Sequence, residues 1–112
     1  MFFKKEINPF PISDNITFRN VDKTINLSVR ADAPSLVLGL KRVQERLTVL
    51  TDETEESERV DAARFFAITI FGTEQGEQLV QFYNSDPLAI ISACGMYFQS
   101  RLAKKITKAQ KK

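Results

Sequence analysis

The stretch over residues 16–50, ITFRNVDKTINLSVRADAPSLVLGLKRVQERLTVL, decides the fold class because its hydrophobic period changes once. Apolar and polar residues alternate over 16–19 and again over 25–30, which is typical of strands with one buried face. The sequence NVDK at 20–23 lies between these runs, and its Asn and Asp favour a turn. We therefore predict a β-hairpin over 16–30, which must pack on helices because two isolated strands are marginally stable.

The period then changes to that of a helix. Asp32 or Ser35 can cap the N-terminus of this helix, and Pro34 suits its first turn. Apolar residues recur at spacings of four, three, four and three, at Leu36, Leu40, Val43, Leu47 and Leu50. This stripe covers only two heptads, so it favours a face that packs on a core over a coiled coil.

A second helix and a short third helix are expected next. Asp52 and Glu55 resemble a capping box for the second helix, whose apolar side runs over residues 60–71. Gly72 fits the position that ends such a helix, and Thr73 can cap the third.

The last helix should begin at Asp86 as N-cap, with Pro87 in the first helical position. We expect Gly95 to permit the close approach of another helix. The predicted apolar stripe of this helix consists of Leu88, Ile91, Gly95, Phe98, Leu102 and Ile106.

The whole chain of 112 residues is predicted to form a single α+β domain, because a chain of this length can bury one core. An N-terminal β-hairpin would pack on a mostly helical body of about four helices. Residues 1–14, where prolines interrupt apolar residues, are expected to form an extended arm. Residues 34–110 would be the helical body, with a basic C-terminal tail.

The composition excludes several kinds of chemistry. With no histidine and one cysteine, the chain can form neither an internal disulfide nor a Cys/His zinc site, and it lacks the base of a Ser–His–Asp triad. Cys94 lies among apolar residues, which predicts a buried, inert thiol. No apolar run reaches the length of about 18 residues that spans a membrane. We therefore expect no enzymatic activity, no metal, no cofactor and no membrane insertion, in a protein used in a cytoplasm.

Charge is segregated along the chain. Residues 45–61 contain seven acidic residues and two basic ones, whereas residues 87–112 contain six basic residues and no acidic one. Both regions can be solvated surfaces. Alternatively, the basic tail binds nucleic acid or another anionic surface, or the acidic region of one copy contacts the tail of the next. The candidate residues for self-association or for an anionic partner are Glu55, Glu56, Glu58, Lys104, Lys105 and Lys108.

Three segments of the C-terminal half carry a resemblance to a known group. These are IFGTE at 70–74, QLVQFY at 78–83 and KKITKAQKK at 104–112. Over residues 60–112 the chain resembles small proteins of tailed phages and prophages, a group similar to siphophage tail assembly chaperones. The resemblance implies a non-enzymatic, homo-oligomeric helical protein of the host cytoplasm that coats the tape measure protein and helps to recruit the tail tube protein.

A chaperone of this kind needs an apolar groove, which helix stripes or a Phe-rich arm could supply. The candidate partner-binding residues are Leu36, Leu40, Leu47, Phe71, Leu79, Phe82, Phe2, Phe3 and Phe10. The six residues from Leu36 to Phe82, which follow the arm, can be either groove or core positions. The alternatives are a structural tail component or small protein-binding adaptor and, less favoured, a basic nucleic-acid-binding regulator.

Overall fold

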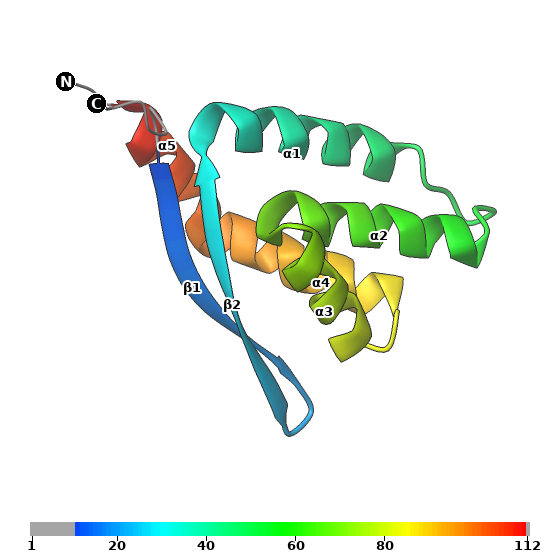
Figure 1. The fold of residues 1–112 in the computed structure, drawn as a ribbon. Coiled ribbons are helices and arrows are strands. Elements are labelled where there is room, and N and C mark those ends of the chain that lie inside the picture. Colours follow the sequence, from blue (N-terminus) through cyan, green and yellow to red (C-terminus); the bar gives the residue numbers. More distant parts are fainter. Residues whose placement is uncertain (1–10, 112) are drawn as a thin grey trace.

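A computed structural model describes residues 11–111 of the chain (Figure 1). An antiparallel hairpin leads into a helical body, which confirms the predicted α+β class. The elements are β1 (Pro11–Asn20), β2 (Lys23–Asp32), α1 (Ala33–Thr48), α2 (Glu56–Phe71), α3 (Thr73–Phe82), α4 (Pro87–Tyr97), a π-helical segment η1 (Phe98–Leu102) and α5 (Ala103–Lys111). The segments α4, η1 and α5 form one continuous helical run.

The hairpin is longer than the sequence pattern predicts. Its turn falls where expected, since Asn20 pairs with Lys23, but β1 begins at Pro11 and Ile12 is buried opposite Ala31. The prediction that residues 11–14 belong to an extended arm is therefore wrong. Proline is tolerated at the first position of a strand, so Pro11 does not prevent pairing. The rest of the predicted arm, residues 1–10, lies outside the described residues.

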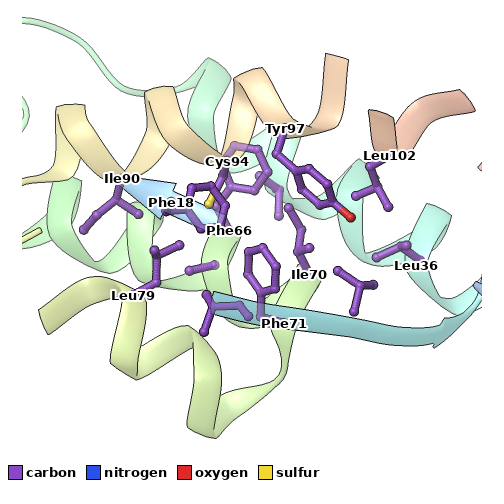
Figure 2. Close-up of a cluster of buried hydrophobic side chains, with 14 of the residues drawn as sticks. Phe18, Leu36, Phe66, Ile70, Phe71, Leu79, Ile90, Cys94, Tyr97 and Leu102 are labelled. Atoms are coloured by element: carbon purple, nitrogen blue, oxygen red, sulfur yellow. The ribbon is translucent and has the colours of Figure 1, made fainter. Parts of the chain in front are cut away.

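Helix α2 occupies the centre of the helical body. It packs against α1, α3 and α4 and also contacts β2. Figure 2 shows how side chains from the hairpin and from the helices meet in one core. Phe71 of α2 contacts Phe18 of β1 edge-on at 5.6 Å and stacks on Tyr97 of α4 at 5.9 Å, as measured between ring centroids. These aromatic contacts join the hairpin, α2 and α4 into one packed unit.

A cluster of polar groups fixes the hairpin to the C-terminal helical run. The Tyr97 hydroxyl donates a hydrogen bond of 2.8 Å to the Asp14 carboxylate, and the Arg101 guanidinium donates one of 2.6 Å. Arg101 also donates to the carbonyl of Asn15. Burial favours a higher pKa for Asp14, but the hydrogen bonds from Tyr97 and Arg101 outweigh it and hold the pKa below its ordinary value.

The start of α2 differs from the prediction. The helix begins at Glu56 after Glu55, and no side chain caps it, so the capping box of Asp52 and Glu55 does not form. The loop has bonds of its own instead. The Arg59 guanidinium donates to the carbonyls of Thr51 and Thr54, and these bonds hold the chain before Glu55 outside the helix.

The junction of α2 and α3 depends on two glycines. Gly72 ends α2 as predicted, with a φ of 87° that favours glycine, and it is also the N-cap residue of α3. Thr73 is the first residue of α3, so the prediction that Thr73 caps this helix is wrong. Gly76 lies so close to α2 that an added Cβ would be 2.7 Å from the Cα of Ile68.

We predict that Gly76→Ala destabilises the protein by about 1–3 kcal/mol, because α3 would have to move away from the backbone of α2. The matched control is Gly95→Ala in α4, where an added Cβ meets nothing within 4 Å. That change should raise stability by about 0.5–1 kcal/mol, because alanine suits a helix interior better than glycine. Urea unfolding measures both, and equal effects of the two changes would contradict the packing described.

We predict that Asp14→Asn reduces the acid sensitivity of the fold. Since the folded state lowers the pKa of Asp14, the stabilisation from its carboxylate is present above the ordinary pKa of 3.8 and is lost as the pH falls through the folded-state pKa. Carboxylates titrate between about pH 5 and pH 2, and over this range the variant should lose less stability than the parent. The control is Asp22→Asn, which removes a carboxylate from the exposed turn and leaves the bonds between Asp14, Tyr97 and Arg101 in place. Parallel curves for parent and Asp14→Asn would contradict this account.

Candidate functional site: an apolar groove between α1 and α4

A groove of about 720 Å³ runs between α1 and the C-terminal helical run. Its floor includes Phe66 of α2, which is buried, and its far wall includes half-buried Ile91 and Phe98. The lining residues are Val37, Leu40, Lys41, Val43, Gln44, Leu47, Thr48, Phe66, Ile91, Gly95, Phe98, Gln99 and Ile106. The groove is therefore mostly apolar, and Lys41 is the one charged side chain that the described residues place in its lining.

The packing of the helices explains why the groove exists. Both α1 and α4 pack mainly on α2, so a gap remains between them above Phe66. Ile106, another lining residue, belongs to α5, which contacts α1 and lies beside the start of α1 (Figure 1). The groove is thus bounded by five elements of the chain, α1, α2, α4, η1 and α5, and belongs to the fold itself.

Helix α4 has an apolar surface on both sides. One side, with Ile90, Cys94 and Tyr97, faces the core (Figure 2). On the other side Leu88 is 74% exposed and Met96 is 70% exposed. Residues 87–100 contain no charged side chain. A helix that is apolar all round is typically buried all round, but the described residues leave this side of α4 uncovered.

The predicted stripe of the last helix is divided in the structure between the surface, the groove and the core. Leu88 is exposed, and Ile91, Gly95 and Phe98 line the groove. Periodicity could not choose between two apolar sides of α4. In addition, the π-helical segment η1 changes the helical register, which lets Leu102 and Ile106 turn into the core farther along.

Gly95 widens the groove. An added Cβ at this position would meet nothing within 4 Å, so no helix among residues 11–111 approaches Gly95 as the sequence analysis expected. Glycine in a helix interior costs about 0.5–1 kcal/mol relative to alanine. Nothing within the described chain offsets this cost by packing against Gly95. An open glycine in an apolar wall is the feature that a closely approaching partner helix would use.

The structure separates the candidate partner-binding residues into groove and core positions. Leu40 and Leu47 line the groove, whereas Leu36, Phe71 and Leu79 are buried in the core. Phe82 is half-buried at the end of α3, where its ring contacts Tyr83 and its carbonyl accepts a hydrogen bond from Asn20 of the hairpin. Phe2, Phe3 and Phe10 lie outside the described residues. Sequence reasoning missed Phe66, and the stripe of α2 offered no signal that this residue is a groove floor.

The candidate charged residues lie at opposite ends of the molecule, whose longest dimension is 54 Å (Figure 1). Glu55, Glu56 and Glu58 are exposed where α2 begins. Lys104 and Lys108 are exposed on α5, whereas Lys105 is half-buried and has its amine 4.0 Å from the Asp14 carboxylate. One copy of the chain therefore keeps its acidic and basic groups apart.

The described residues provide neither a reactive thiol nor a cluster of metal ligands. Burial raises the pKa of the Cys94 thiol to about 12, so the thiol stays protonated. Residues 11–111 contain no cluster of three or more potential metal ligands. Over the same residues, none of the helices combines the length and the apolar character that crossing a membrane requires.

Comparison with protein-family models, with curated proteins and with solved structures finds no match to this chain.

We predict that Cys94 reacts with a thiol reagent such as dithionitrobenzoate only when the protein unfolds. Its side chain is fully buried and the raised pKa removes the thiolate at neutral pH. The reaction rate should rise with urea in parallel with the unfolded fraction. Rapid reaction of the folded protein would show that the inner side of α4 is not packed as described.

Proposed function

We propose that the protein is a non-enzymatic tail assembly chaperone of a tailed phage, which binds and shields the tape measure protein in the host cytoplasm. The observation that carries the proposal is the apolar groove with an open glycine in its wall. The resemblance of residues 60–112 to small phage tail proteins supports the same assignment.

The dimensions of the groove fit a short helical segment. From Val37 to Thr48 the wall of α1 rises by about 17 Å, which corresponds to about three turns of a bound helix. An amphipathic helix can place apolar residues at positions i, i+3, i+4 and i+7 into such a groove. Each large apolar side chain that becomes buried contributes about 1.5–3 kcal/mol, before the cost of association.

A tape measure protein suits this kind of binding because it is long, helical and partly apolar. Successive copies bound along one client would hold it jointly, even if each copy alone binds weakly. We propose that the copies also contact one another and that the assembly recruits the tail tube protein. The alternative function, a structural tail component or adaptor, would use the same groove but would remain in purified particles.

We predict that the protein keeps the tape measure protein of its phage soluble when the two are produced together. The substitution Gly95→Phe should lower recovery of the complex between the two proteins by about tenfold. The phenyl ring would fill the groove from a position where the chain leaves open space, so the fold should persist. A tenfold loss corresponds to about 1.4 kcal/mol, less than the burial of one large side chain provides.

The control is Val21→Ala at the exposed tip of the hairpin, away from the groove. Thermal unfolding of each variant verifies that it is folded. Full recovery of the complex with Gly95→Phe, or no complex with the parent, would contradict the proposed function.

A further inference from the structure

We infer that the groove accepts its helix in one direction, antiparallel to α1, with a basic N-terminal end at the α1–α2 loop and an acidic C-terminal end at α5. This inference rests on the proposed function and adds the charge pattern and the orientation of the bound segment.

The two ends of the groove are defined by different parts of the chain. The lining residue Thr48 is the last residue of α1, next to the α1–α2 loop, and the lining residue Ile106 belongs to α5. Helix α5 lies beside the start of α1 (Figure 1). A helix that fills the groove therefore has one terminus near the loop and the other near α5.

The loop end is acidic. Asp52, Glu53 and Glu55 are exposed there, and none of them forms an ion pair within residues 11–111. The nearby cations are engaged elsewhere. Arg59 donates to backbone carbonyls of the loop, and Arg46 lies over the Phe65 ring, 4.9 Å from its centroid.

The α5 end is basic. Lys104 and Lys108 are exposed, and neither is in an ion pair among the described residues. Arg101 pairs with Asp14, whereas the Asp32 carboxylate accepts a hydrogen bond from the backbone N–H of Ser35, which lowers its pKa and leaves it an anion. Among the described residues, the positive charges of Lys104 and Lys108 therefore exceed the negative charge of Asp32 at this end.

The polarity of a helix adds to these side-chain charges. A helix carries partial positive charge at its N-terminus and partial negative charge at its C-terminus. Both favour a bound helix whose N-terminus meets the acidic loop and whose C-terminus meets the lysines of α5. The apolar middle of the groove supplies affinity without direction, so the charged ends decide the orientation.

Two synthetic peptides of about 18 residues test the inference. Both carry the same apolar stripe and the same composition. One has lysines in its first turn and glutamates in its last turn, and the other has these charges exchanged. At low salt, fluorescence anisotropy should show that the first binds the parent protein about five- to tenfold more tightly, and at about 1 M salt the difference should largely vanish. The second peptide, with glutamates in its first turn and lysines in its last, forms a helix more readily by itself. A difference in helix content therefore cannot explain tighter binding of the first peptide.

A charge-reversed protein provides the matched test. Lys104→Glu combined with Lys108→Glu, both at exposed positions, should remove or invert the preference. Arg19→Glu combined with Lys23→Glu makes the same change in net charge at the exposed end of the hairpin and should leave the preference intact.

Equal binding of both peptides to the parent, weakened for both by Gly95→Phe, would overturn the orientation and leave the groove's function in place. Binding that Gly95→Phe does not weaken, or no binding of either peptide, would overturn both the orientation and the proposed function. The expected preference, lost in the Lys104→Glu, Lys108→Glu protein alone, supports both.

Discussion

Helices α1 and α4 pack on the same central helix, α2, and this shared packing determines where the groove lies. Ala63 and Ala67 of α2 are completely buried, and such small side chains let neighbouring helices approach closely. Phe66, on the same helix, lies between α1 and α4 and forms the groove floor. The groove therefore follows from how the core is built, because α1 and α4 both pack on α2 and leave Phe66 between them.

The walls of the groove are held in place by contacts outside it. The stack of Phe71 on Tyr97 and the bonds that Asp14 accepts from Tyr97 and Arg101 fix the C-terminal helical run against α2 and the hairpin. A preorganised groove binds at lower entropic cost than one that must form on contact. Its apolar wall is left open at Gly95, and the charges at its two ends are not neutralised within the described chain. These features serve no packing purpose among the described residues, and they are the ones that the proposed binding of a helix would use.

Local signals predicted much of the fold. The change of hydrophobic period placed the hairpin and α1, and Asp32 and Asp86 cap α1 and α4 as expected from their positions before Pro34 and Pro87. The site could not be predicted in the same way. Helix α4 is apolar on all sides, so its sequence pattern cannot indicate which side faces the core. We recognise no sequence signal for the register change in η1. Leu40 and Leu36 share one stripe, and only the positions of α2 and α4 in space make the first a groove residue and the second a core residue.

Methyl NMR of the protein, with labelled isoleucine, leucine and valine, would show whether a helix binds in the groove. A helical segment of the tape measure protein would be added in steps, and the methyl signals followed. The account predicts shifts of Leu40, Leu47 and Ile91, which line the groove, and little change at Leu79 in the core or at Val21 at the end of the hairpin. Shifts confined to the hairpin, with the groove methyl groups unchanged, would contradict it.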